Sequence, residues 1–252
     1  MTKAKKKIIK FIGGLGNQMF QYALGKAIEK NSTAKVLFDI TSYGNPKYIN
    51  NKRGLSVRKY EMHIFQNANI KIANKFETLI IKFLNLIGIT KKYKEKDPFK
   101  YDESIFVNNN YSYFTGYYQN EKYFKSIREE LIKDFELPAI KENDDYNRNL
   151  LEEIKNSNNS VFIHVRREDY IPLGFCISLD YYKKAVEYIK TKVENPTFFV
   201  FCAEDEDYIK NEFDIGCEFK FIGEKNVPIG KTELNFVESK WKRFHVSIGC
   251  RF

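Results

Sequence analysis

The stretch V-F-I-H-V-R-R-E-D-Y, residues 161–170, joins a short apolar run to a dense charged cluster. Its first five residues are apolar or β-branched apart from one histidine, which predicts a buried strand. The charged residues then lie at the carboxyl end of that strand, where open α/β sheets bind their ligands. Arg166 and Arg167 are permanently charged and present planar donors that match phosphate oxygens. The stretch therefore predicts an α/β sheet with a phosphate site. The alternative is a surface cluster in which both arginines pair with Glu168 and Asp169.

The composition is that of a globular protein. Apolar residues make up 43% and aromatic residues 16% of 252 residues, enough for one large α/β domain or two small ones. The net charge of +9 favours an anionic partner, which includes nucleotides, acidic glycans, nucleic acids and membrane surfaces. The lysines are scattered among asparagines, so charge alone does not choose among these classes.

The cysteines and the apolar segments indicate the compartment. The four cysteines are widely spaced and form no C-x-x-C pair, and none lies at metal-ligand spacing from a histidine. Free thiols in a reducing compartment are expected, without a zinc site. The run Ile8–Ile12 is interrupted by Lys10 and predicts a strand instead of a signal peptide. The most apolar window, Leu79–Ile89, is too short to span a membrane, so a soluble, cytoplasmic protein is expected.

That apolar window is amphipathic. Five of its residues fall on one helical face, namely Leu79, Ile80, Phe83, Leu84 and Ile87. The pattern favours a helix, within Ala73–Ile87, whose apolar face meets the core. A helix that lies in the interface of a membrane is the alternative.

The N-terminal segment predicts a βαβ unit. A strand at Ile8–Ile12 is followed by the glycine-rich turn G-G-L-G-N-Q at Gly13–Gln18, a helix, and a second strand at Val36–Ile40. The glycines permit a tight turn and close approach of a ligand to the helix N-terminus. The dinucleotide pattern G-x-G-x-x-G fails at Met19, which argues against a nicotinamide enzyme. The amide of Asn17 suits a sugar or phosphate, and simple helix capping is the alternative for it.

The middle of the chain carries weaker signals. We expect a short strand at Leu55–Met62, a solvated charged connector at Lys91–Pro98 and an amphipathic helix at Ser126–Phe135. Aromatic and amide residues alternate in Phe114–Phe124, which is typical of a carbohydrate site and equally of a packed corner. The polar stretch Lys141–Asn159 is expected to separate two halves.

Strands and helices also alternate in the second half, with a helix at Asp180–Val193 and strands at Thr197–Cys202 and Glu218–Ile222. The carboxylates of residues 204–207 are expected to lie at the start of a helix, where negative charge is stabilised. The alternative is that one of them orients a ligand hydroxyl. The expected fold is two Rossmann-like domains that face a cleft, with boundaries 1–145 and 146–252.

Three segments together resemble a known family. These are G-G-L-G-N-Q-M-F-Q-Y-A (Gly13–Ala23), G-Y-Y-Q-N-E-K-Y-F (Gly116–Phe124) and I-H-V-R-R-E-D-Y (Ile163–Tyr170). They resemble the α-1,2-fucosyltransferases of glycosyltransferase family 11, and the resemblance covers about residues 8–222. It implies a GT-B-like architecture with an acceptor-side domain at 1–145 and a donor domain at 146–252. It further implies GDP-L-fucose as donor, a galactose-terminated glycan as acceptor, inversion of configuration, and neither metal nor cofactor.

The resemblance also implies the site residues. Arg166 would hold the donor diphosphate with help from Arg167, and these two are the expected catalytic residues because charge develops on the departing diphosphate. His164 and Asp169 would shape the same pocket. The first domain would approach the donor with Gly14, Gly16, Asn17 and Gln18. A carboxylate or His164 would serve as a general base, and the sequence does not select one.

The chain departs from the family in two places. Glu168 stands where the family carries glycine, and Thr232–Phe252 matches no part of the family pattern. We therefore expect a donor domain that is truncated or divergent after about residue 231. The expected function is fucosyl transfer in surface polysaccharide or lipopolysaccharide synthesis, with peripheral contact to the inner membrane left open and no nucleic acid as partner. An impaired transferase that only binds nucleotide, and a basic nucleic-acid-binding protein, are the alternatives.

Overall fold

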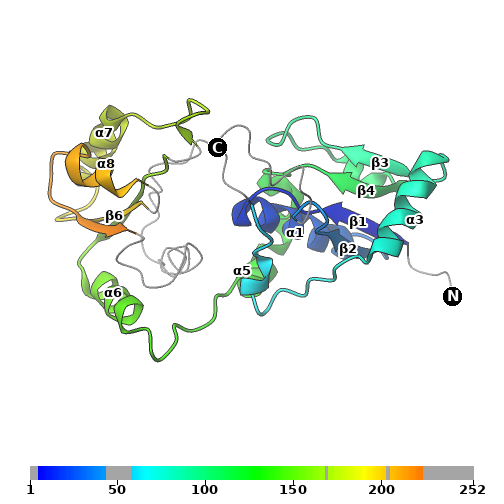
Figure 1. Ribbon diagram of the computed structural model, residues 1–252, viewed down its shortest axis with the longest axis horizontal. Helices are drawn as coiled ribbons and strands as arrows, with labels where there is room; N and C mark the ends of the chain where they lie inside the picture. The colour runs from blue at the N-terminus through cyan, green and yellow to red at the C-terminus, as the bar shows by residue number, and fades with distance from the viewer. Residues whose placement is uncertain (1–4, 44–57, 168–169, 203–204, 224–252) are drawn as a thin grey trace. The chain divides into compact units, whose positions relative to one another are not determined.

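The chain folds into two compact units, each built on a parallel β-sheet. The computed structural model describes residues 5–43, 58–167, 170–202 and 205–223 (Figure 1). The first unit ends at Pro138 and the second begins at Ala139. Both units alternate strands with helices, which confirms the expected α/β class.

The first unit has a four-stranded sheet in the order β2-β1-β4-β3, and every pairing is parallel. Its strands are β1 (Lys6–Lys10), β2 (Lys35–Asp39), β3 (Lys91–Lys94) and β4 (Tyr111–Thr115). The helix α1 (Leu15–Lys30) connects β1 to β2, and Ile8 is aligned with Leu37 of β2 and with Tyr113 of β4. The predicted βαβ unit is therefore confirmed.

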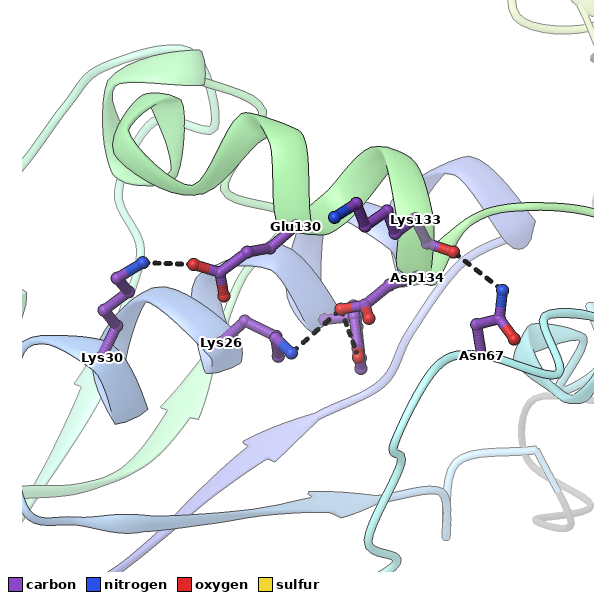
Figure 2. Close-up of polar contacts among 7 residues, drawn as sticks. Lys26, Lys30, Asn67, Glu130, Lys133 and Asp134 are labelled. Atoms are coloured by element: carbon purple, nitrogen blue, oxygen red, sulfur yellow. Dashed lines mark hydrogen bonds and ion pairs between the residues drawn. The ribbon is translucent and has the colours of Figure 1, made fainter.

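Helix α1 is fastened to α5 (Arg128–Asp134) by polar contacts (Figure 2). The carboxylate of Asp134 lies 3.0 Å from the Lys26 ammonium and accepts a hydrogen bond of 2.9 Å from the Tyr22 hydroxyl. One helical turn further along α1, Lys30 pairs with Glu130 of α5. These contacts fix α5, which follows the loop after β4, against the helix that follows β1. The two loops at the carboxyl ends of β1 and β4 are thereby held in one arrangement.

Helix α3 (Lys75–Leu86) packs against β3 and β4 through a narrow stripe. Its N-terminus has a capping box in which Asn74 and Glu77 exchange hydrogen bonds. Thr78 and Ile81 are buried, but the predicted core face is not: Leu79, Ile80, Phe83 and Ile87 are exposed, and Leu84 is partly buried. The expectation of a core-facing apolar face is wrong. Apolar residues surround most of this helix, so periodicity alone did not show which side meets the sheet.

Two further expectations fail in the first unit. The charged stretch after α3 is not a simple connector, because Lys91–Lys94 forms the edge strand β3 with Tyr93 buried. In the described part of Leu55–Met62, from Arg58 on, there is no strand, and a 3₁₀ turn begins at Met62. The remaining short elements are η1 (Met62–Ile64), α4 (Ser104–Val107), η2 (Glu121–Tyr123) and η3 (Lys125–Ile127), the last of which forms the first turn of the predicted helix before α5.

The second unit has a three-stranded parallel sheet in the order β5-β6-β7. Its elements are α6 (Asp145–Asn156), β5 (Ser160–His164), α7 (Leu179–Lys190), β6 (Thr197–Cys202), α8 (Glu206–Asn211) and β7 (Lys220–Gly223). The predicted strands and the predicted helix α7 are confirmed, whereas α6 lies inside the stretch expected to be a polar junction. Leu150 and Ile154 of α6 cover one face of the sheet, and α7 and α8 cover the other.

None of the helices in the part of the chain that the structure describes is long and apolar enough to cross a membrane. Cys176, Cys202 and Cys217 form no disulfide bond in the structure. Cys250 lies outside the described residues.

Candidate functional site

In the second unit, the arginine pair lies at the carboxyl end of β5, as predicted. The ladder with β6 continues one residue beyond β5, because Val165 N–H donates to Phe201 O at 2.8 Å. Arg166 and Arg167 follow immediately, beside the end of β6. Alternation along the strand places Val161, Ile163 and Val165 in the core under α7. The two arginines therefore leave the sheet from one edge at successive positions.

Arg167 is held by two partners from the segment after β6. Its Nε donates to Asp205 Oδ2 at 2.6 Å, and its guanidinium carbon lies 3.7 Å from the centre of the Tyr208 ring. Asp205 also caps α8, because its side chain accepts a hydrogen bond from Tyr208 N–H. Burial is the largest single influence on the pKa of Arg167 and lowers it, but the hydrogen bond to Asp205 together with the charge of Asp205 and the neighbouring Tyr208 and Cys176 leaves the net pKa raised. Arg167 is thus a fixed cation with a set orientation.

Arg166 has different surroundings. Its guanidinium carbon lies 4.4 Å from the centre of the Tyr170 ring, which suits a cation–π contact. The neighbouring His164 is the last residue of β5 and is partly buried. Burial, with the charge of Arg166 as the second cause, lowers the pKa of His164 to about 4. The imidazole is therefore neutral at pH 7, where it can share a hydrogen bond but is a weak general base.

Two of the expected contributors to this cluster cannot be placed. Glu168 and Asp169 lie outside the described residues. The role of Asp169 in shaping the pocket therefore stays a prediction. The alternative surface cluster, in which both residues pair with the arginines, stays a prediction too. The partner that the structure gives Arg167 is Asp205, which was expected from the sequence to begin a helix or, alternatively, to orient a ligand hydroxyl. The available signal was that β5 and β6 are consecutive parallel strands, whose carboxyl ends meet at one edge.

In the first unit, the glycine-rich loop joins β1 to α1 by a turn that requires glycine. Gly13 has φ +80°, and a Cβ there would lie 2.4 Å from Asn17 Nδ2. Helix α1 begins with Gly14 as N-cap, and no side chain caps it. Asn17 lies within the first turn of α1, so the alternative interpretation of Asn17 as the capping residue is wrong.

The loop after β1 is tied to the loop after β4. Asn17 Oδ1 accepts a hydrogen bond from Gln119 Nε2 at 2.8 Å. The buried Gln21 donates to Ile12 O and to Gly116 O, and it accepts from Ile12 N–H. Two of the three segments that carry the family resemblance, around Gly13 and around Gly116, are thereby brought into contact.

Gln18 has a positioning role. Its side chain is fully buried, and its amide donates to Gly13 O at 3.1 Å and to Lys59 O at 2.8 Å. The amide oxygen accepts from Glu61 N–H at 3.0 Å. Three protein partners occupy this amide, so it holds the loop of Lys59–Glu61 against the glycine turn. The expected donor-binding role of Gln18 has no support in this geometry.

Gly14 and Gly16 lie on the open side of the same turn. The position of a Cβ on Gly16 has no other atom within 4 Å, and on Gly14 it would lie 3.7 Å from Arg58 Cδ. A guanidinium group therefore lies near the uncapped N-terminus of α1, a combination that suits an anion. Sequence reasoning missed Arg58, because no local pattern links it to a turn more than forty residues earlier.

The loop after β4 is shaped by a partly buried carboxylate. Glu95 accepts hydrogen bonds from Tyr117 N–H at 2.6 Å and from Tyr118 N–H at 2.9 Å, and burial raises its pKa. Tyr118 has a positive φ of 56° and is fully buried. The aromatic segment Phe114–Phe124 is thus a packed corner in the structure, and its sugar-binding interpretation stays a prediction.

Comparisons with known proteins agree with the segments that carry the resemblance. A family model described as "Glycosyl transferase family 11" matches residues 7–236. The match reaches past residue 231, where we expected the similarity to stop. An "Alpha-1,2-colitosyltransferase" of Escherichia coli is 32% identical over 236 residues, which cover 85% of this chain and 76% of that protein.

Two more distant similarities were found. The "O-antigen biosynthesis glycosyltransferase WbnK" of Escherichia coli is 25% identical over 227 residues, which cover 80% of this chain and 73% of that protein. Among solved structures, a glycosyl transferase family 9 protein from Veillonella parvula matches with a TM-score of 0.38 and 9% identity, over 89% of this chain and 72% of that chain.

Proposed function

The chain belongs to glycosyl transferase family 11, and from that membership we propose that it transfers L-fucose from GDP-L-fucose to the 2-hydroxyl of a galactose-terminated glycan. Glycosyl transfer itself follows from the family. The sugar, the nucleotide and the acceptor are the proposed part, and so are inversion of configuration and transfer without a metal.

The observation that carries the proposal is the pair of guanidinium groups at the carboxyl end of β5. Departure of the nucleotide leaves a diphosphate whose developing charge must be stabilised, and fixed cations do this without reorganisation. Arg167, oriented by Asp205 and Tyr208, supplies a fixed charge. Arg166 supplies the second charge beside the neutral His164. We assign Arg166 to the diphosphate and Arg167 to its support.

His164 fits the donor side better than the acceptor side. With a pKa of about 4 it is too weak a base to deprotonate a sugar hydroxyl effectively at neutral pH. It is suited to donate one ring N–H to a phosphate or ribose oxygen. In this proposal the acceptor hydroxyl is activated by a carboxylate, as one of the sequence-based alternatives held.

The likeness to a colitosyltransferase favours a second candidate sugar. Colitose is L-fucose without its 3-hydroxyl group, so the two donors differ by one oxygen. A site that hydrogen-bonds that hydroxyl discriminates strongly, by about 10⁴ or more, and a site that merely leaves space for it discriminates weakly. The activity of the colitosyltransferase makes colitose transfer in O-antigen synthesis the competing assignment.

The test is a transfer assay with paired donors and paired acceptors. Purified protein is incubated with GDP-L-fucose or GDP-colitose and with a β-galactoside or its 2-deoxygalactose analogue, and the product is analysed by mass spectrometry and NMR. We expect a fucosylated product with the galactoside and none with the 2-deoxy analogue. Product from GDP-colitose alone would replace fucose by colitose, and product from the 2-deoxy analogue would contradict the proposed linkage.

A further inference from the structure

Helix α3 presents a continuous apolar face to solvent. Six exposed apolar side chains lie on α3 or directly after it, namely Phe76, Leu79, Ile80, Phe83, Leu86 and Ile87. Phe76 is 70% and Leu86 83% exposed, and the other four are at least 42% exposed. At about 100° per residue, all six fall within an arc of about 120°. Figure 1 shows α3 at the margin of the first unit.

This exposure requires an explanation, because the opposite stripe of α3 is already packed. Thr78 and Ile81 are buried on the sheet, so rotation of the helix would expose them in exchange. Single exposed apolar residues are ordinary on protein surfaces, whereas a contiguous face of six marks a docking surface. The α3 face, as we call these six residues, is therefore a surface for a partner.

The charge around the α3 face identifies the partner's chemistry. Residues 71–96 contain seven lysines and two glutamates. Both glutamates are engaged within the protein, Glu77 with Lys6 and Glu95 with the backbone of Tyr117 and Tyr118. The lysines are exposed, and Lys75 and Lys82 lie directly at one edge of the apolar arc, where Lys82 also lies 3.8 Å from the carboxylate of Asp39. An apolar face with a basic rim matches a surface that is apolar inside and anionic at its boundary.

A cavity beside α3 has both apolar and basic lining residues, although Lys7 is buried and Lys6 pairs with Glu77. It has a volume of about 260 Å³ and lies where the C-terminal half of α3 meets the start of β1. Ile81, Leu84 and Ile89 line it together with three successive lysines, Lys5, Lys6 and Lys7.

We propose that the α3 face docks on an anionic lipid bilayer, with α3 lying parallel to the membrane plane. The six apolar side chains enter the boundary between headgroups and acyl chains, and the surrounding lysines contact lipid phosphates. A second copy of this chain fits less well, because a two-fold dimer would bring two lysine-rich rims against each other. The proposal does not depend on which sugar the protein transfers.

Vesicle co-sedimentation tests the proposal with the full chain. We expect binding to vesicles of phosphatidylglycerol and phosphatidylcholine, and weak binding to phosphatidylcholine alone. The double variant Leu79→Glu, Leu86→Glu should reduce binding by about tenfold or more, because it places two charges in the apolar boundary. Both residues are exposed, so circular dichroism and thermal unfolding of this variant should match the wild type.

Two control variants separate this surface from general stickiness and from general charge. Tyr188→Glu changes a side chain of α7 that is 64% exposed in the second unit, and it should leave vesicle binding unchanged. Lys71→Gln with Lys75→Gln should weaken binding to anionic vesicles and make it less sensitive to salt. Sedimentation velocity without lipid should show a monomer.

Three outcomes would overturn the proposal. One is no binding to anionic vesicles by the folded wild-type protein, and another is equal binding by the wild type and the Leu79→Glu, Leu86→Glu variant. The third is self-association in the absence of lipid that this variant abolishes, since the α3 face would then be an interface between copies of the chain.

Discussion

Arg167 Nε donates a 2.6 Å hydrogen bond to Asp205 Oδ2, which links the residue after β5 to the residue that begins α8. The two side chains are 25% and 27% exposed, so the pair is neither deeply buried nor at the open surface. Asp205 serves two purposes, because it caps α8 with one oxygen and orients Arg167 with the other. This pairing fixes the orientation of Arg167, which agrees with the supporting role that we propose for it beside Arg166.

The two purposes of Asp205 can be separated by substitution. Asp205→Asn keeps a good capping residue and removes the charge, so it should lower the free energy of unfolding by about 1 kcal/mol. Asp205→Ala removes both functions and should cost about 1 kcal/mol more. Urea denaturation measures both values. Equal costs for the two variants would show that the cap contributes nothing and that the charge alone matters.

Gly13 and Gly16 are a matched pair in one turn. Gly13→Ala places a Cβ at φ +80° against Asn17, so it should destabilise the protein by about 1–2 kcal/mol. Gly16→Ala meets no atom and lies in α1, so it should stabilise the protein by about 0.5–1 kcal/mol. If a ligand approaches the backbone at Gly16, this stabilised variant should nevertheless lose transferase activity. Full activity of Gly16→Ala would remove Gly16 from the donor site.

The pKa of His164 reports on the neighbouring anion site. Without ligand it should titrate near pH 4, well below an exposed histidine, in an NMR titration of ring protons. Since burial and the Arg166 charge lower this pKa, a bound diphosphate that offsets the positive charge should raise it. The sequence has three histidines, so a His164→Asn variant assigns the signal. A pKa that does not change when GDP binds would place the nucleotide elsewhere.

The same depressed pKa predicts a pH dependence of stability. Between about pH 6.5 and pH 4 the unfolded state binds a proton at this histidine that the folded state does not. Stability from this group is therefore complete above about pH 6.5 and decreases as the pH falls towards 4. His164→Asn should flatten the unfolding free energy across this window, measured by urea denaturation at several pH values. An unchanged pH profile would show that His164 is more hydrated than the structure indicates.

Asp39 should control acid stability in the first unit. Burial alone would raise the pKa of this carboxylate, but hydrogen bonds from Thr41 and the Tyr113 hydroxyl, with Lys82 nearby, hold the pKa below its usual value. A depressed pKa contributes stability above the unfolded value of about 3.9, and this contribution is lost as the pH falls through the folded value. Asp39→Asn should cost about 1–3 kcal/mol at pH 7 and less at low pH. If Asp39→Asn lowered the free energy of unfolding by the same amount at pH 7 and at low pH, the assignment of acid stability to Asp39 would be contradicted.

Much of the second unit followed directly from the sequence. The strands β5 and β6 and the helix α7 were predicted because each element carries one clear period, and Tyr182, Val186 and Ile189 form the buried face of α7. The strand β3 was missed because three of its four residues are lysines, and only the burial of Tyr93 reveals it. An edge strand tolerates such a composition, since one side of it faces solvent.

The candidate site was predictable in its residue types and less so in its pairings. Arg166, Arg167 and the glycine turn were found because strand ends and tight turns have local signals. The partners Asp205, Arg58 and Gln119 come from segments 38 to 102 residues away along the chain, and only the folded sheet places them. The direction of the α3 face was mispredicted for a similar reason, because the contacts that choose the buried stripe come from β3 and β4.

Isothermal titration with GDP tests the central claim most directly. We expect the wild type to bind GDP and Arg166→Ala to bind it at least about tenfold more weakly, since a charge-assisted contact to phosphate contributes about 1.5–3 kcal/mol. Arg128→Ala is the matched control, because Arg128 is exposed and pairs with Glu129 on α5 of the first unit. It should bind GDP like the wild type. Equal GDP affinity of the wild type and a folded Arg166→Ala variant would contradict the assignment of this arginine to the donor diphosphate.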